Sequence, residues 1–338
     1  MAGVPDLNVV GVRGVDRGDS DYEVANLLDS RGQHLTIKYP LNDIAGAALE
    51  AEFVVADSLL EELREKNLPF DVLRPIGFSS YRDHRAAIFH TPAGRPLEFA
   101  SFSAELAREL GRTIAAIHSL EPAALTRVGM PEYTIEKWRA RLTAELDEVE
   151  SLGRVAPALI GLWRETIDDD GLWTFTPVVV HGDVADENFL WSEGTVRSVI
   201  GFGDAHIGDP ATDFGPILAS LSPEMFEQFE TAYRNSVAVA PDEFLIQRAG
   251  FMSEFALARW LLHGELTHND DVIADATQML DDLAEQTITA PSFNYEGVSS
   301  EKLRFDTESS DSVQSAAPAQ SPTSAQASAP AFIQENQD

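Results

Sequence analysis

The stretch "VVVHGDVADENFLW", from Val178 to Trp191, holds the residues that decide the fold. Its apolar start predicts a short buried strand, which Asp183 follows directly, with Asn188 five residues later. A carboxylate can orient a hydroxyl group and accept its proton. A neutral amide oxygen can ligate a hard cation without adding negative charge beside a phosphate. The two residue types therefore suit the transfer of a phosphoryl group.

The spacing of Asp183 and Asn188 is that of a kinase catalytic loop, where the aspartate accepts a hydroxyl proton and the asparagine holds magnesium. The tripeptide "HGD" alone is a weak signal, because a solvated aspartate at a strand end is common. Here the asparagine is in step, and "FLWSEGTVRSVIGF" at residues 189–202 predicts the hairpin that follows such a loop. Together these features favour a kinase site.

The residues before this stretch predict a small sheet with one helix. Alternation from Tyr22, a turn at "DSRG" (residues 29–32) and the strand "HLTIKYP" (residues 34–40) indicate a hairpin. Residues 43–66 predict a helix with a broad apolar face, behind Asp43 as a plausible cap. Further strands are expected in "NLPFDVLRPIGF" and "RAAIFH", and a connector rich in Pro and Gly follows at residues 91–96.

The later residues predict mostly helices. Ser103 is expected to cap the first of them, and "GDPATDF" at residues 208–214 indicates another helix start. We therefore predict an α+β, two-lobed, protein-kinase-like fold with a small β-rich N-lobe and a larger helical C-lobe. The expected parts are an N-terminal nucleotide-binding lobe (1–89), a hinge (90–97), a helical lobe with the catalytic loop and acceptor pocket (98–290), and a disordered tail rich in Ser, Ala, Pro and Gln (297–338). Helices are expected at residues 103–120, 135–152, 157–167, 223–239 and 243–262.

The composition limits the classes of partner. The formal net charge is −32, and −27 of it remains without residues 296–338, so we expect no binding to nucleic acid. The acidity fits solubility or adaptation to salt, and it also fits attraction of a cationic small molecule. The chain has no cysteine and no run of 18 or more apolar residues, and its start does not resemble a secretory signal. We expect a cytoplasmic monomer that does not enter a membrane.

The segment "HGDVADEN … VIGFGDAHIGDPATDF" resembles the aminoglycoside-phosphotransferase-like family of small-molecule kinases, and within it the chain is most similar to the macrolide 2′-phosphotransferases. "DSDYEVANLLDSRGQHLTIKYP", "NLPFDV", "VGMPEYT" and "DDDGLWTFTPVVVHGD" support the closer match. The resemblance covers residues from about 15 to 285. It implies a nucleotide bound between two lobes. It also implies an antibiotic-resistance enzyme that moves the γ-phosphate of GTP (or ATP), with Mg2+, to the macrolide sugar hydroxyl beside a dimethylamino group.

The resemblance assigns roles one residue at a time. Asp183 matches the catalytic base, Asn188 matches a magnesium ligand, and His181 matches the histidine that supports the loop. Lys38 matches the residue that pairs with the nucleotide phosphates. Its expected helix partner is Glu52, with Glu50 or Asp57 as alternatives because the register of the helix is uncertain. Further matches are Ser20 and Asp21 at the tip of the phosphate-covering turn, and Phe89, His90 and Thr91 at the hinge that lines the base pocket, although burial at a strand end is a rival interpretation for Phe89.

Gly201 departs from the family pattern. The family has a magnesium-binding aspartate in "I-D-F" or "I-D-W", about eighteen residues beyond the catalytic one, and this chain has "IGF" there. Asp204 is a candidate replacement ligand, although along an extended backbone its odd offset tends to point it to the other face. For Asp209 and Asp213 we favour structural roles at a helix start.

Three explanations of Gly201 stay open: an altered active enzyme, a natural protein that binds without turnover, or an enzyme that uses Asp204 instead. The function predicted first is phosphoryl transfer to a macrolide. The alternatives are a kinase-fold binding protein without turnover and a kinase of an aminoglycoside or an amino alcohol. The partner in each case is a small molecule with a cationic amine.

Overall fold

A five-stranded antiparallel sheet forms the N-terminal part of the computed structural model, which describes residue 4 and residues 6–17, 21–66 and 68–289. Its strand order is β1-β2-β3-β6-β5. The turn between β2 and β3 is fixed by Asp29, whose carboxylate accepts hydrogen bonds from the Arg31 and Gln33 N–H groups, and by Gly32 at a φ of 78°. Glycine suits this left-handed position because it has no β-carbon. The strands are β1 (Val9–Arg17), β2 (Tyr22–Asp29), β3 (His34–Pro40), β5 (Pro75–Tyr81) and β6 (His84–His90).

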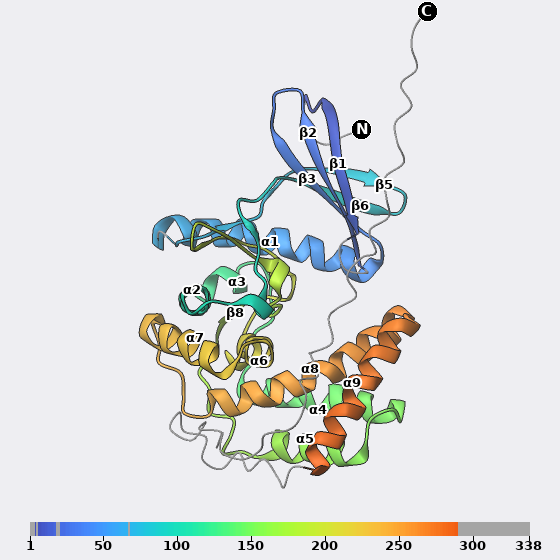
Figure 1. The fold of residues 1–338 in the computed structure, drawn as a ribbon, viewed down its shortest axis with the longest axis vertical. Helices are drawn as coiled ribbons and strands as arrows, with labels where there is room; N and C mark the ends of the chain where they lie inside the picture. Colours follow the sequence, from blue (N-terminus) through green and yellow to red (C-terminus); the bar gives the residue numbers. More distant parts are fainter. Residues whose placement is uncertain (1–3, 5, 18–20, 67, 290–338) are drawn as a thin grey trace, which may run out of the picture.

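Helix α1 (Asp43–Lys66) lies under this sheet, between the sheet and the helical part of the molecule (Figure 1). Its Leu49 and Phe53 pack on Ala87 and Phe89 of β6 in a small apolar cluster. Val55, Ala56 and Leu59 of the same helix belong to the main core of the helical part. α1 therefore connects the two apolar clusters, and its bounds agree with the predicted ones.

The C-terminal part is helical, with short strands around the catalytic loop. The Ser103 hydroxyl caps α2 by accepting a hydrogen bond from the Leu106 N–H. β8 leads into the loop, and β9 and β10 form the predicted hairpin after it. The helices are α2 (Ala104–His118), α3 (Ala123–Thr126), α4 (Ile135–Leu152), α5 (Pro157–Asp168), α6 (Ala211–Ser220), α7 (Pro223–Ser236), α8 (Leu245–Thr267) and α9 (Asp270–Thr289), and the short strands are β4 (Asp71–Val72), β7 (Arg95–Pro96), β8 (Val178–Val180), β9 (Phe189–Ser192), β10 (Thr195–Val199) and β11 (His206–Gly208).

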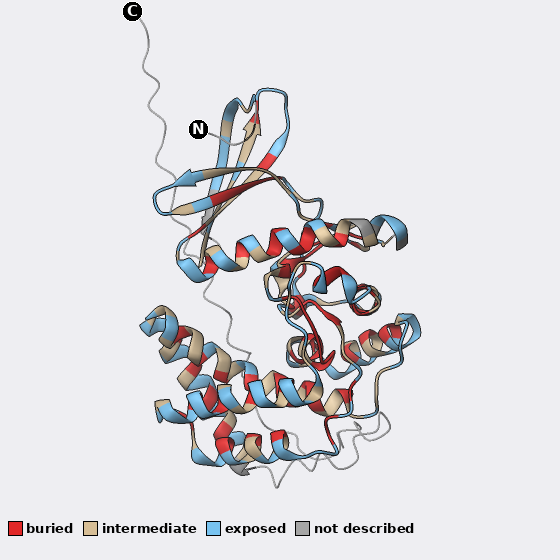
Figure 2. Cartoon of the chain, turned by 180° about the vertical axis from the view of Figure 1, so that it is seen from behind, coloured by how far each residue is buried: buried red, intermediate tan, exposed pale blue. Residues whose placement is uncertain are grey.

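The predicted α+β class, with a β-rich N-terminal region and a helical C-terminal region, is confirmed. Buried residues line the inner faces of α1, α2 and α8, whereas their outer faces are exposed (Figure 2). The sequence did not predict α9, whose residues carry many acids in its first turns, or β11. The predicted tail (297–338) lies outside the described residues. Within the described ranges, no helix is long and apolar enough to cross a bilayer.

Candidate active site

The predicted catalytic pair meets in the loop after β8. The Asn188 side-chain amide donates hydrogen bonds of 2.8 Å to Asp183 Oδ2 and 2.9 Å to the Asp183 carbonyl oxygen. Partial desolvation by the surrounding residues raises the pKa of Asp183 above its ordinary value, against the lowering effects of His181 and of the bond from Asn188, although the residue is open to solvent. A carboxylate with a raised pKa accepts a proton more readily than one with the ordinary pKa. The arrangement suits a general base for a hydroxyl group.

His181 holds the loop in shape. Its Nδ1 accepts the Asp183 N–H at 3.2 Å, and its Nε2 donates to the Ile200 carbonyl oxygen at 2.8 Å. The ring packs on Phe202 with centroids 4.5 Å apart. Because a backbone carbonyl can only accept, the Ile200 contact fixes the protonated ring nitrogen as Nε2. The geometry gives His181 the supporting place that the resemblance implies.

Asp213, in the first turn of α6, anchors the loop from below. Its Oδ2 accepts the His181 N–H at 2.8 Å and His118 Nε2 at 3.0 Å, and its Oδ1 accepts the Gly182 N–H at 2.8 Å. His118 Nδ1 lies 2.9 Å from the Tyr233 hydroxyl, so the network continues into α7. Burial works against ionisation, yet the hydrogen bond and charge of His118 hold the pKa of Asp213 below its ordinary value. Asp213 has the structural role that was expected of it.

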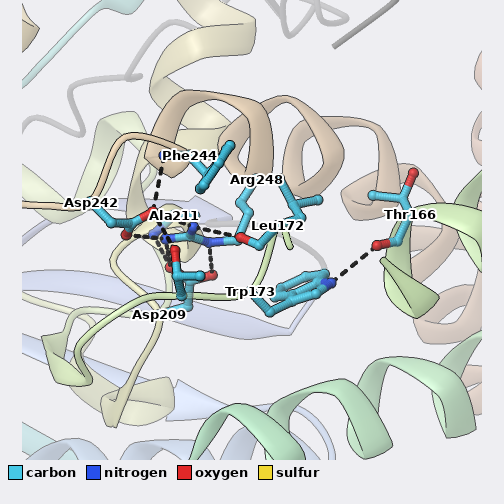
Figure 3. Close-up of polar contacts among 9 residues, drawn as sticks. Thr166, Leu172, Trp173, Asp209, Ala211, Asp242, Phe244 and Arg248 are labelled. Carbon is cyan, nitrogen blue, oxygen red and sulfur yellow. Dashed lines mark hydrogen bonds and ion pairs between the residues drawn. The ribbon is translucent and has the colours of Figure 1, made fainter. Parts of the chain in front are cut away.

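Asp209 also has a structural role, in a buried ion-pair cluster (Figure 3). Arg248 of α8, fully buried, donates to Asp209 Oδ2 at 2.7 Å and to Asp209 Oδ1 at 3.1 Å. The same guanidinium donates to Asp242 at 2.7 Å and 2.8 Å, and these carboxylates raise the pKa of Arg248 against the lowering effect of burial. The cluster holds the start of α6 against α8. No local pattern indicates the pairing of Arg248 with Asp209, because these two residues are 39 positions apart along the chain.

Lys38 and Glu52 form the predicted pair between β3 and α1. Lys38 Nζ lies 3.6 Å from Glu52 Oε2 and 4.0 Å from the centroid of the Tyr22 ring. Glu52 Oε1 accepts the Gly201 N–H at 2.7 Å, which joins the N-terminal part to the segment after β10. The structure thus selects Glu52 as the partner. The two alternatives are engaged elsewhere, Glu50 with Arg85 and Asp57 with Arg74.

Phe89 is a core residue, in agreement with the rival interpretation of burial at a strand end. It is 1% exposed, and its ring centroid lies 5.4 Å from that of Phe53. The Phe89 side chain therefore belongs to the core, and only its backbone lies at the hinge. His90 is exposed, and the Thr91 N–H donates to the His34 carbonyl at 3.0 Å.

The phosphate-covering turn is described in part. Ser20 lies outside the described residues. Asp21 accepts a hydrogen bond of 2.8 Å from the Asn42 amide, and its Oδ2 lies 3.6 Å from His263 Nε2 of α8. The turn therefore contacts the start of α1 and a helix of the C-terminal part, so it reaches across the two parts of the molecule.

Gly201 has a left-handed backbone, with φ of 82° and ψ of 26°. A β-carbon placed on it would lie 2.5 Å from Asn188 Oδ1. The Asn188 amide therefore occupies the space that a side chain at position 201 would need. This contact is a consequence of the glycine that the sequence could not predict.

Asp204 lies closer to the catalytic loop than an extended backbone would bring it, because residues 202–204 form a 3-10 turn. Its β-carbon would lie 3.2 Å from a β-carbon placed on Gly182. After burial itself, the charge of Asp204 is a further cause that raises the pKa of Asp183. Asp204 is exposed. The role of Asp204 as a replacement ligand stays a prediction.

Two side chains could hold a magnesium ion here: Asn188, through Oδ1, and Asp204, through its carboxylate. An amide oxygen and one carboxylate fit this hard cation, which commonly takes its other ligands from phosphates and water. In the described part of the chain, no group of three or more His, Asp or Glu side chains is placed to hold a metal. The donor set thus fits an ion that depends strongly on the nucleotide.

Comparison with known proteins gives a family match that contains this site. The model of the phosphotransferase enzyme family matches residues 45–244. Viomycin phosphotransferase of Streptomyces vinaceus is 33% identical over 145 residues, and the uncharacterized protein YcbJ of Bacillus subtilis is 25% identical over 113 residues. These segments are 39% and 33% of this chain, but the match spans only 49% and 37% of those two proteins.

Solved structures match over more of the chain. The macrolide 2′-phosphotransferase MphH from Brachybacterium faecium, an apoenzyme, has a TM-score of 0.68 at 21% identity, covering 81% of this chain and 94% of its own. The GDP and kanamycin complex of APH(2″)-IIIa has a TM-score of 0.67 at 18% identity, with 83% and 95% coverage. At such identities the likeness shows a shared fold.

Proposed function

The chain belongs to the phosphotransferase enzyme family, and from that premise we propose that it transfers the γ-phosphate of GTP or ATP to a sugar hydroxyl of a macrolide. The observation that carries the proposal is the convergence of Asp183 and Asn188, at 2.8 Å, beside the Lys38–Glu52 pair. These are the parts that phosphoryl transfer requires for positioning and for charge stabilisation.

In this mechanism Asp183 orients the acceptor hydroxyl and takes its proton as the oxygen bonds to the γ-phosphorus, while the bond from that phosphorus to the bridging oxygen breaks and the nucleoside diphosphate leaves. Lys38, held by Glu52, steadies the phosphates of the nucleotide, and His181 with Asp213 keeps the loop in place. Magnesium, which Asn188 and Asp204 would hold, supplies positive charge that stabilises the charged phosphates. Desolvation raises the pKa of Asp183, and the positive charge of Lys38 lowers it. The two side chains therefore interact electrostatically.

Two observations support a macrolide as the acceptor. A macrolide 2′-phosphotransferase is among the structural neighbours, and a net charge of −32 favours an acceptor with a cationic amine. Viomycin phosphotransferase and a kanamycin complex are also among the relatives, so aminoglycosides and related cationic antibiotics are the next acceptors to compare.

The test is transfer of labelled γ-phosphate from GTP and from ATP, with magnesium, to erythromycin, kanamycin, viomycin and choline. The expected result is a phosphorylated macrolide that the Asp183→Asn variant does not produce. Product from kanamycin or choline alone would mean that the chain catalyses the same reaction on a different acceptor. Absence of product with every acceptor, at enzyme concentrations that match the substrate, would overturn the proposal.

A second function, binding of nucleotide and antibiotic without turnover, is favoured by Gly201 and by the Asn188 amide that fills its side-chain space. Calorimetry of magnesium-dependent nucleotide binding, run beside the transfer assay, separates the two. In the binding protein, the nucleotide binds but transfer is absent, and Gly201→Asp restores it. Gly201→Asn is the matched control, because asparagine tolerates a left-handed backbone equally well and supplies no charge.

A further inference from the structure

The Lys38 ammonium has a second neighbour besides Glu52, the aromatic ring of Tyr22 on β2. Lys38 Nζ lies 4.0 Å from the centroid of this ring and 3.6 Å from Glu52 Oε2. A cation and a ring attract each other within about 6 Å, so the first distance is a close cation–π contact. The second distance is longer than a hydrogen bond, which in proteins extends to about 3.2 Å. The ring therefore contacts the charge at least as closely as the predicted carboxylate does.

The register of the sheet places Tyr22 beside Lys38. In the antiparallel pair of β2 and β3, Val24 lies opposite Lys38, and Tyr22 lies opposite Pro40. Side chains two residues apart on a strand share one face of the sheet, so Tyr22 is the diagonal neighbour of Lys38. Aromatic and long side chains reach each other across such a diagonal. The contact thus follows from the pairing of the two strands.

Two fixed groups confine the ammonium. The Tyr22 hydroxyl donates a hydrogen bond of 3.0 Å to the Ala45 carbonyl oxygen of α1, and the residue packs against the small apolar cluster between α1 and β6. On the other side, Glu52 Oε1 accepts the Gly201 N–H at 2.7 Å, which orients the carboxylate. Both partners of Lys38 are therefore held by contacts other than Lys38 itself.

An aromatic ring holds an ammonium in a different way from a carboxylate. The electron-rich face of the ring attracts the cation, yet the ring carries no net charge. A second carboxylate in its place would offset the charge that the phosphates of a nucleotide need. A lysine side chain is also flexible, so restricting it in advance lowers the entropy cost of binding an anion. The ring supplies this restriction and leaves the positive charge uncompensated on its side.

We propose that Tyr22 is a positioning residue for Lys38, whose ammonium its ring holds toward the phosphates of a bound nucleotide. The contact of ring and ammonium is a property of the chain without ligand. Its effect on nucleotide binding rests on the proposed function. Two measurements test these two parts separately.

The first measurement needs no nucleotide. The chain has four lysines, at positions 38, 66, 137 and 302, so reductive methylation with 13C-formaldehyde gives few lysine signals in an NMR spectrum. Methylation keeps the positive charge, and Lys38→Arg identifies the Lys38 signal. The ring current of Tyr22 shields methyl groups above its face. The Lys38 signal is therefore expected upfield of its position in Tyr22→Leu, and Tyr22→Phe, which keeps the ring, should retain the upfield position.

Phe78→Leu is the matched control. Phe78 packs against the same apolar cluster as Tyr22, but its ring faces Arg85, whose guanidinium lies 3.6 Å from the ring centroid. The substitution removes an aromatic ring from that cluster without removing a contact of Lys38. It should leave the Lys38 signal where it is in the wild type. Thermal unfolding checks that each variant is folded.

The second measurement is calorimetry of GTP and ATP binding in the presence of magnesium. Tyr22→Leu is expected to weaken nucleotide binding about twofold to tenfold, the range of a cation–π contact, and Phe78→Leu should leave the affinity unchanged. In a Lys38→Ala background, Tyr22→Leu should have no further effect, because the ring then has no ammonium to hold. This double-mutant cycle separates positioning of Lys38 from a general structural role of Tyr22.

Each part has a result that overturns it. The same Lys38 signal position in the wild type and in Tyr22→Leu would show that the ring does not hold the ammonium. An equal loss of affinity from Tyr22→Leu with and without Lys38 would make Tyr22 a structural residue. If Tyr22→Leu does not fold, the reference is the urea-unfolded wild type, and an unshifted Lys38 signal overturns the proposal. If the wild type binds no nucleotide, the proposed function fails, and the NMR comparison still decides the contact.

Discussion

Asp213 contacts the catalytic loop and Asp183 lies within it, and the surroundings of these two carboxylates differ, because Asp213 has no exposed surface whereas Asp183 is open to solvent. Asp213 accepts three hydrogen bonds, from two backbone N–H groups and from His118, and these hold its pKa below the ordinary value despite burial. In the described part of the chain, Asp183 accepts one side-chain bond, from Asn188, and partial desolvation raises its pKa. The anchor is saturated with donors, whereas the base keeps capacity for a ligand.

This difference teaches how one short segment can be rigid and reactive at once. Asp213 stabilises the fold, because three hydrogen bonds from the protein replace the water around its charged form. Reactivity is left at Asp183, where the charged form lacks part of that solvation. Perturbed carboxylates of this second kind concentrate at functional sites. Substitutions at the two positions should therefore affect different observables.

Asp183→Asn should cause the largest change, in activity alone. Removing a general base lowers the rate of proton transfer, and we expect phosphate transfer to fall by about 10²–10⁴-fold. The stability should not fall, because the charge that the variant removes is partly desolvated and poorly compensated. Labelled-phosphate transfer and urea unfolding measure the two effects. A variant with normal transfer would remove Asp183 from the chemistry and break the comparison.

Asp213→Asn should act mainly on stability. It leaves His118 and the loop N–H groups without their carboxylate, and breaking a buried pair of this kind costs about 3–5 kcal/mol. Urea unfolding at pH 7 measures the free energy. Asp170→Asn is the control, since that carboxylate is exposed and pairs with Arg139 at the surface. A loss below about 1 kcal/mol, within the usual range of a surface pair, would show that Asp213 is no anchor.

Gly201→Ala should have a smaller effect, at the contact between position 201 and Asn188. The left-handed backbone and the contact with Asn188 Oδ1 should together cost about 1–2 kcal/mol of folding stability. The cost should decrease in an Asn188→Ala background, where the contact is gone and only the backbone strain is left. A double-mutant cycle measures this coupling. An additive cycle would mean that Asn188 moves away freely and that only the backbone strain at position 201 is measured.

The catalytic pair could be predicted from the sequence because its geometry is local. Asp183 and Asn188 are five residues apart after a strand, so the chain itself brings them together. Lys38 and Glu52 followed from the strand, the helix and the resemblance, and the structure resolved the register of the helix. The family match, over residues 45–244, includes the loop that carries Asp183 and Asn188.

The rest depends on contacts between distant residues. His118 is 95 residues from Asp213, and Arg248 is 39 residues from Asp209, so no local pattern indicates either pair. A cavity beside Trp138 joins α4, α8 and the segment after Gly201, which only the folded chain brings together. Two interpretations of Phe89 stayed open because a strand-end aromatic can line a pocket or fill a core, and only the packing of α1 decides between them.

The pH dependence of stability gives the finest test of the comparison. A carboxylate whose folded pKa is lowered contributes stability that is present above its ordinary pKa of 3.8 and is lost as the pH falls through the folded value. The advantage of the wild type over Asp213→Asn should therefore be full at pH 7 and should shrink below about pH 4. Asp183 has a raised folded pKa, so the effect of Asp183→Asn should have the opposite sign: its stability relative to wild type should rise as the pH increases from about 4.

Urea unfolding of the three proteins at pH 3, 5 and 7 measures both differences, and comparison with wild type cancels the repulsion that a net charge of −32 adds to every chain. If the stability of each variant relative to wild type changed with pH in the same direction, the two carboxylates would be equivalent supports of one loop, and the division between anchor and base would be lost.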